Sequence, residues 1–81
     1  MDIYGFFASM LNCYESDLRV NRLLIWREAD IASIPDECFS LAEWNAFLRY
    51  ALTESPVFSS VSEAKRYLIE KKCLRNARLS G

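Results

Sequence analysis

Glycine is nearly missing from this chain, and that shortage limits the folds open to it. Only two glycines, Gly5 and Gly81, occur in the 81 residues. The tight turns of β-hairpins rely on glycine or on Asn-Gly pairs, because their central residues take positive φ angles. The interior of the sequence contains no such turn signal. We therefore expect an all-α fold, a small single-domain bundle of about four helices.

The clearest helix signal lies between residues 39 and 53. Ser40 and Glu43 have the S-x-x-E spacing of a capping box, in which each side chain accepts a hydrogen bond from the other residue's backbone N–H. Phe39 and Trp44 have the spacing of a hydrophobic staple across this cap. The apolar residues then recur every three or four positions. They are Leu41, Trp44, Leu48, Ala51 and Leu52, with Phe47 on the margin. This stretch is predicted to be the central core helix.

Helices are also predicted nearer the two ends of the chain. Asp2 can cap a helix that runs to about Tyr14. Its apolar face comprises Ile3, Phe6, Phe7, Met10 and Tyr14. Ser16 is expected to cap a second helix that begins near Asp17. Near the C-terminus, Ser60 and Glu63 repeat the capping-box spacing, which predicts a helix from residue 61 to about residue 74.

Residues 18–34 have no single clear periodicity. A helix would place Val20, Leu23, Leu24, Ile31 and Ile34 on one face but would put a charge, Arg27, in its middle. The short apolar run from Leu23 to Trp26 also has the length of a strand. Helix is the preferred interpretation. The alternative is an α+β fold with a short strand or hairpin around residues 22–27.

Composition and length favour one globular domain. Apolar residues make up 52% and aromatic residues 14% of the chain, enough to build a core rather than leave the chain disordered. We expect a single helical domain over residues 1–81, with residues 76–81 as a frayed tail.

Several features favour a cytoplasmic protein with no membrane partner. The N-terminus lacks the positive region and cleavage site of a signal peptide, and no apolar stretch approaches the roughly 20 residues of a transmembrane helix. The cysteines, Cys13, Cys38 and Cys73, are too far apart for a C-x-x-C pair and are expected to be reduced thiols.

The sequence lacks the residues that most enzymatic mechanisms need. It contains no histidine, the usual general base near neutral pH and the commonest metal ligand. It also has no glycine-rich phosphate loop and no zinc or calcium spacing. We therefore expect a non-catalytic protein with no cofactor and no metal site.

The remaining hypothesis is a protein that binds another macromolecule, with a protein as the preferred partner, and that acts as a regulator, adaptor or inhibitor of the kind that phages and mobile elements encode. Tyr4, Trp26 and Tyr50 are the aromatic candidates, because exposed Trp and Tyr are frequent binding hot spots. Tyr50 lies opposite the apolar stripe of the central helix and is predicted to be free. The alternative is that all three are partly buried packing residues.

Two further surfaces are candidates for protein contacts. Asp30, Asp36 and Glu37, with Asp17 near them, could form an acidic cluster that faces a basic partner. The first helix, residues 2–14, has a small, uncharged side that could mediate self-association. That side comprises Gly5, Ala8, Ser9 and Asn12.

Nucleic-acid binding is the alternative function. Residues 1–62 carry nine acidic and four basic side chains, whereas residues 63–81 carry two acidic and six basic ones. The basic candidates for phosphate contact are Lys65, Arg66, Lys72, Arg75 and Arg78, and Tyr67 could stack on a base. The net charge of −1 makes this function the less favoured one.

Overall fold

The protein is built from short helices joined by connecting segments. The structure, a computed structural model, describes residues 2–21 and 23–73. Those ranges contain α-helices, a 3₁₀ turn (η1) and a π-helical turn (η2), and no strand. The elements are α1 (Ile3–Met10), α2 (Asp17–Val20), α3 (Glu28–Ala32), η1 (Asp36–Cys38), α4 (Leu41–Leu52), α5 (Val61–Leu68) and η2 (Ile69–Cys73). The prediction of an all-α fold is confirmed.

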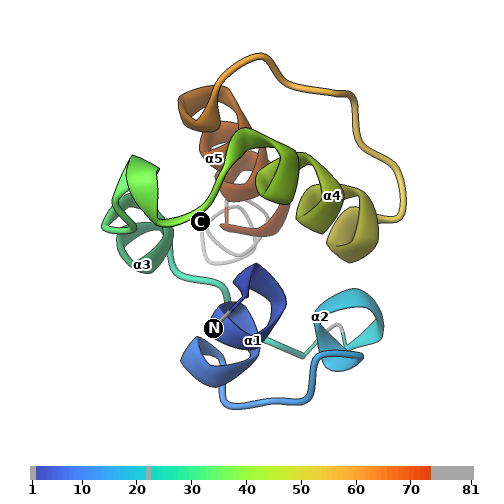
Figure 1. The fold of residues 1–81 in the computed structure, drawn as a ribbon. Coiled ribbons are helices and arrows are strands. Elements are labelled where there is room, and N and C mark those ends of the chain that lie inside the picture. The colour runs from blue at the N-terminus through green and yellow to red at the C-terminus, as the bar shows by residue number, and fades with distance from the viewer. Residues whose placement is uncertain (1, 22, 74–81) are drawn as a thin grey trace.

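The longest helix, α4, is the centre of the arrangement. It contacts α5 on one side and α1 and α2 on the other, and α3 contacts η2, which continues α5 (Figure 1). Because α4 contacts α1, α2 and α5, its apolar residues face several neighbours. Trp44, Phe47, Leu48 and Ala51 are accordingly buried.

Three helix starts agree with the sequence signals. At α4, the Ser40 hydroxyl oxygen accepts a hydrogen bond from the Glu43 N–H at 3.1 Å, and the Glu43 carboxylate accepts one from the Ser40 N–H at 2.9 Å. The Ser60 hydroxyl oxygen accepts from the Glu63 N–H at 3.2 Å at the start of α5. Asp2 caps α1 by accepting from the Gly5 N–H at 2.8 Å. Each of these contacts satisfies a backbone donor that the helix itself leaves unpaired.

The first helix is shorter than the prediction that ran to Tyr14. It ends at Met10 because Asn12 takes a positive φ of 55°, which asparagine tolerates better than most residues. The Cys13 N–H then donates to the Ala8 carbonyl at 2.9 Å, and the Asn12 N–H donates to the Ser9 carbonyl at 3.2 Å. These two bonds form a Schellman motif, which closes the helix.

The predicted cap of the second helix is wrong. Helix α2 does begin at Asp17, but the Ser16 side chain makes no capping hydrogen bond. Instead, the Asp17 carboxylate accepts a hydrogen bond from the Tyr14 N–H at 3.1 Å. The charge of Asp17 also suits the positive end of the helix dipole.

Residues 18–34 form neither one helix nor a strand. Helix α2 ends at Val20 and α3 begins at Glu28. Leu23 lies in a turn, residues 24–27 have no regular secondary structure and pair with no strand in the described ranges, and Arg22, part of the predicted strand, lies outside those ranges. The Asn21 side chain accepts a hydrogen bond from the Leu23 N–H at 2.9 Å, a local contact that competes with helix formation.

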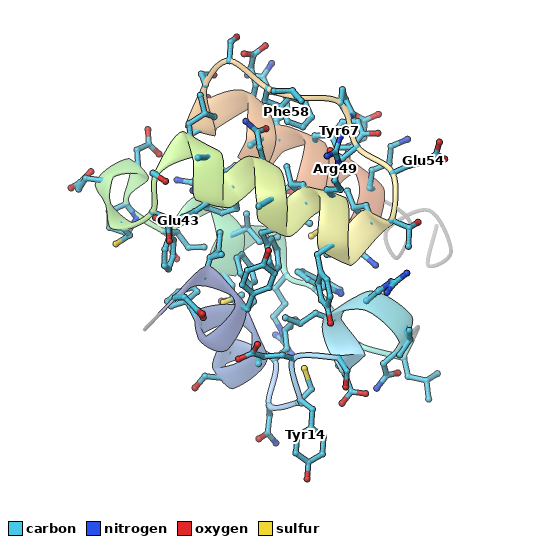
Figure 2. The ribbon with its side chains drawn as sticks, turned by 45° about the vertical axis from the view of Figure 1, so that its right-hand side comes forward. Tyr14, Glu43, Arg49, Glu54, Phe58 and Tyr67 are labelled. Carbon is cyan, nitrogen blue, oxygen red and sulfur yellow. The ribbon has the colours of Figure 1, made fainter. Side chains whose placement is uncertain are left out.

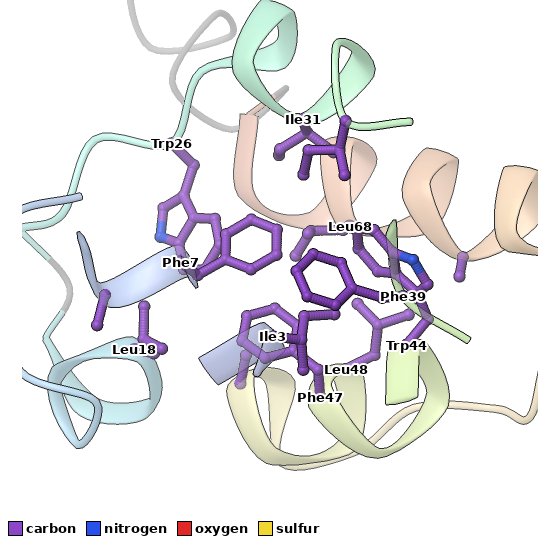
Figure 3. Close-up of a cluster of buried hydrophobic side chains, with 14 of the residues drawn as sticks. Ile3, Phe7, Leu18, Trp26, Ile31, Phe39, Trp44, Phe47, Leu48 and Leu68 are labelled. Atoms are coloured by element: carbon purple, nitrogen blue, oxygen red, sulfur yellow. The ribbon is translucent and has the colours of Figure 1, made fainter. Parts of the chain in front are cut away.

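The core combines a cluster of aromatic rings with aliphatic side chains from all five α-helices. Phe7 and Phe47 stack with ring centroids 4.5 Å apart, and Trp26 points toward Phe7 (Figure 3). The Phe39 and Trp44 rings lie 6.3 Å apart, which confirms the predicted staple. Leu74, the predicted end of the last helix, and the predicted frayed tail at 76–81 lie outside the described residues.

Candidate functional site

The three aromatic candidates are packing residues in this structure. Trp26 is 4% exposed, and its ring centroid lies 5.7 Å from that of Phe7. Tyr4 makes edge contacts with Phe47 at 5.6 Å and with Tyr50 at 5.4 Å. The prediction of a free Tyr50 is wrong, because this side chain is half-buried and its hydroxyl donates to a backbone carbonyl, that of Glu15, at 3.4 Å. The alternative of partly buried packing residues describes all three.

The acidic candidates are divided between two sides of the molecule. Asp30 in α3 and Asp36 and Glu37 in η1 belong to neighbouring elements, whereas Asp17 belongs to α2, away from α3 (Figure 1). Asp36 is joined to Lys65 by an ion pair of 2.7 Å. The charge of Asp36 is therefore balanced within the protein although its side chain is exposed; Glu37 is also exposed, and Asp30 is half-buried.

The basic candidates do not form one free surface. Lys65 is 9% exposed, and its ammonium group donates to the Ile34 carbonyl as well as to Asp36. The Lys72 ammonium group lies 5.4 Å from the centre of the Trp26 ring, in a cation–π contact. Arg66 is exposed. Arg75 and Arg78 lie outside the described residues.

Tyr67, the proposed stacking residue, also has neighbours. Its ring centroid lies 5.0 Å from that of Phe58, and the Lys71 ammonium group lies 5.3 Å from the ring centre. Tyr67 lines an open groove of about 630 Å³ beside the loop after α4, with Arg49 and Glu54 near it (Figure 2). Arg49 and Glu54 give the lining of the groove one charge of each sign.

The small, uncharged side of α1 is partly used by the core. Ala8 is only 7% exposed, and Gly5 is half-buried. Ser9 and Asn12 are exposed. Only these two residues of the predicted docking side can therefore contact a second copy without rearrangement.

One stretch of the sequence carries most of the strongly exposed large apolar side chains, and the sequence patterns did not predict this. Among the described residues, five large apolar side chains are strongly exposed, and four of them lie between residues 14 and 25. These four are Tyr14 (81% exposed), Val20 (68%), Leu23 (88%) and Ile25 (65%); the fifth is Val57 (77%). Figure 2 shows Tyr14 projecting away from the helices. We call the exposed side chains of Tyr14, Val20, Leu23 and Ile25, which lie in or near α2 in the sequence, the α2 apolar surface.

The residues from Leu23 to Arg27, the connector segment, alternate between surface and core. Leu23, Ile25 and Arg27 are exposed, Trp26 is buried and Leu24 is half-buried. Arg27 has the φ and ψ of a β-strand, −108° and 128°. No hydrogen bond joins the backbone of Leu24, Ile25 or Trp26 to another residue within 2–21 and 23–73. The connector segment therefore turns Leu23, Ile25 and the charged Arg27 outward, and its backbone is hydrogen-bonded at Leu23 and Arg27.

A signal for this surface was present in the sequence but was ambiguous. The run Leu-Leu-Ile-Trp is too short for its periodicity to separate a helix from a strand. The helix interpretation placed Val20 and Leu23 in the core, where the structure does not place them. Alternation of period two, with Trp26 inward, would have predicted the exposed pair.

Comparisons with known proteins leave the function to be argued from these surfaces. The chain matches no protein-family model, no curated protein and no solved structure. In the part of the chain that the structure describes, every helix is too short or too polar to cross a membrane. The same part contains no group of three or more Cys, Asp or Glu side chains placed to hold a metal ion.

Proposed function

We propose that this protein is a non-catalytic protein-binding module, which acts in the cytoplasm as a regulator, adaptor or inhibitor of a partner protein. The observation that supports this function is the α2 apolar surface. Single exposed apolar residues are common on soluble proteins. Four large ones within twelve residues, each at least 65% exposed, are a local concentration of the kind that favours a binding surface.

A shortage of core space does not account for the exposure. The same stretch of chain buries Leu18 (1% exposed) and Trp26 (4% exposed) completely. Burying a large aliphatic side chain gains roughly 1.5–3 kcal/mol relative to leaving it in water. The exposed Leu23 and Ile25 would gain free energy of this size in a complex, as anchors at the centre of protein interfaces do.

In this proposal Trp26 and Tyr50 do not contact the partner but pack the neighbouring chain against the rest of the protein. Trp26 packs the connector segment against Phe7, and the Tyr50 hydroxyl donates to the Glu15 carbonyl just before α2, so both ends of this stretch contact the rest of the protein. A fixed surface loses less conformational entropy on binding than a mobile one. The exposed acid Glu37 lies on another side and would affect steering by charge.

Nucleic-acid binding is less well supported. Lys65 is buried against Asp36, and Lys71 and Lys72 lie over aromatic rings, which leaves few free cations on the described part of α5 and η2. A protein that binds phosphates needs several of them on one face.

Affinity capture from the native cells, with a nuclease-treated arm, tests the proposed function. The bait variants are Leu23→Glu with Ile25→Glu, and the matched control is Val57→Glu, which changes an equally exposed apolar residue elsewhere. We expect wild type and control to enrich the same protein, and the double variant to lose it while keeping its helical circular dichroism. Capture that is unchanged in the double variant, or absent from the wild type, would contradict the proposal. Capture that is lost only after nuclease treatment would favour nucleic acid.

A further inference from the structure

We infer that the groove beside the loop after α4 binds a carboxylate group of a partner, either the C-terminus of a peptide or an acidic side chain, through the guanidinium group of Arg49. The inference goes beyond the proposed function, because it concerns a different site and does not depend on the α2 apolar surface. Three observations support it: the groove itself, the contacts that fix its walls and the unbalanced charge of Arg49.

The groove lies where three segments of the chain meet. Helix α4 contributes Arg49, α5 contributes Tyr67, and the loop between these helices contributes residues 53–56 (Figure 2). Its volume is about 630 Å³. A concave site of this size with a few polar groups that converge on it is where proteins bind small ligands and single side chains.

Side-chain contacts hold the walls of the groove in place. Asn45 lies four residues before Arg49, on the same face of α4. Its side-chain amide accepts a hydrogen bond from the Phe58 N–H at 2.8 Å and donates one to the Phe58 carbonyl at 3.2 Å. The Phe58 ring centroid in turn lies 5.0 Å from that of Tyr67. These contacts join α4, the loop and α5 around the groove, and a preformed site loses little conformational entropy when a ligand binds.

Arg49 supplies the charge that selects the ligand. Its side chain is exposed, and its guanidinium group makes no ion pair or hydrogen bond within residues 2–21 and 23–73. Those ranges include all eleven acidic side chains of the protein, so the rest of the chain has none that could neutralise it. A guanidinium group presents parallel N–H donors that match the two oxygens of a carboxylate.

The other charges near the groove favour a ligand with a single negative charge. Glu54 lines the groove without an ion pair to Arg49, so it repels an anion that binds there. The Lys71 ammonium group lies 5.3 Å from the centre of the Tyr67 ring, but Lys71 is not a lining residue. A phosphate dianion would be repelled more strongly than a carboxylate and would find one cation, whereas phosphate sites use several.

NMR titration of the full ¹⁵N-labelled chain tests the site. The probes are acetyl-trialanine with a free C-terminus, the same peptide as its C-terminal amide, and that amide with glutamate in place of the middle alanine. Because the groove is open, we expect a Kd of about 1 mM, so each probe is added to about 10 mM. We expect both carboxylate probes to shift the backbone amide signals of residues 53–55, and the uncharged amide to leave them unchanged.

The probes also separate the two sources of the carboxylate. Shifts from only one carboxylate probe would assign the site to that source, C-termini or acidic side chains. No shift from either probe overturns the inference, and so do equal shifts from the uncharged amide. Inorganic phosphate is added as a fourth probe, and tighter binding of phosphate than of both carboxylates would also overturn it.

Charge variants test the role of Arg49. Arg49→Gln should raise the Kd by about tenfold or more, since it removes the charged donor. Arg27→Gln, which changes an exposed arginine in the connector segment, should leave the Kd unchanged. Glu54→Gln should lower the Kd by roughly two- to fivefold, because it removes an exposed repulsive charge. An unchanged Kd in Arg49→Gln, or a raised one in Glu54→Gln, overturns the inference; the dispersion of the remaining amide signals shows that each variant is folded.

The two proposals can fail separately. If no carboxylate probe binds but the α2 apolar surface still captures a protein, the binding function stands and the carboxylate site falls. If the carboxylate probes bind but no protein is captured from cells, the carboxylate site stands and the regulatory function falls.

Discussion

The ammonium group of Lys65 lies 2.7 Å from the carboxylate of Asp36 and joins α5 to the 3₁₀ turn that precedes α4. Lys65 is 9% exposed and also donates to the Ile34 carbonyl. The sequence makes each residue a candidate for contact with a partner: Lys65 with phosphate, and Asp36 with a basic protein. Their contact with each other gives both a structural role.

Removing the acidic partner should destabilise the fold. Asp36→Ala leaves the buried ammonium group of Lys65 without its counter-charge. We expect the free energy of unfolding to fall by about 1–2 kcal/mol, a modest value because the Asp36 side chain is itself 66% exposed. Glu37→Ala, which changes the neighbouring exposed acid, should alter it by less than about 0.5 kcal/mol. Urea denaturation monitored by circular dichroism measures both, and equal effects would show that the ion pair contributes nothing.

Helix α4 ends at a strained residue that glycine should relieve. Thr53 has φ 60° and ψ −32°, and the Glu54 N–H donates to the Leu52 carbonyl at 2.6 Å, as in a γ-turn. A β-branched residue is unfavourable at positive φ, whereas glycine adopts it freely. We expect Thr53→Gly to stabilise the protein by about 1 kcal/mol, which would raise Tm by about 4–8 °C. Thr53→Ala is the control and should stabilise less. A lower Tm for the glycine variant would contradict the strain.

The aromatic stack in the core should be essential for folding. Phe7 is fully buried and stacks on Phe47, so Phe7→Ala should cost about 3–5 kcal/mol. A domain of this size has a total stability of roughly 3–5 kcal/mol. We therefore expect the variant to be largely unfolded at 25 °C and to show no cooperative transition on heating. Tyr14→Ala removes an aromatic ring that is 81% exposed and should change stability by less than about 0.5 kcal/mol. A folded Phe7→Ala protein would show that the core tolerates the cavity.

The three thiols should react at very different rates. Cys38 is exposed, Cys13 is half-buried and Cys73 is buried. Burial, with smaller contributions from Glu28 and Asp30, raises the pKa of the Cys73 thiol, and burial also raises the pKa of Cys13. The thiolate is the reactive form. Iodoacetamide at neutral pH should therefore label Cys38 first and Cys73 last, as peptide mass spectrometry would measure. Early labelling of Cys73 would place it at the surface.

The same raised pKa values make the fold sensitive to alkali. The pKa values of Cys73 and Tyr4 are higher in the folded protein than in the unfolded chain, chiefly because burial disfavours the charged forms. Above the ordinary thiol pKa the unfolded chain binds fewer protons than the native protein, so stability falls as pH rises. We expect urea midpoints to decrease between about pH 8 and about pH 10.5, and less steeply in Cys73→Ala. An identical decrease in that variant would assign the effect to other groups.

The sequence by itself determined the local features of this fold. The capping box of Ser40 and Glu43, the start of α5 at Ser60 and the cap at Asp2 all follow from interactions between residues at most four positions apart. Such contacts depend on spacing and side-chain chemistry alone, so they can be recognised before any tertiary contact is known. The shortage of glycine acts locally as well, since it removes the tight turns of hairpins.

Only the tertiary structure decided which residues face the solvent in residues 18–34 and on α5. Leu23 is exposed while Trp26 is buried because the connector segment directs one side chain toward Phe7 and its neighbours outward. Lys65 is buried because Asp36, 29 positions earlier, lies beside it. Tyr50 is held by Tyr4 and Glu15. These outcomes depend on contacts between residues far apart in the chain, and a pattern of neighbouring residues does not contain that information.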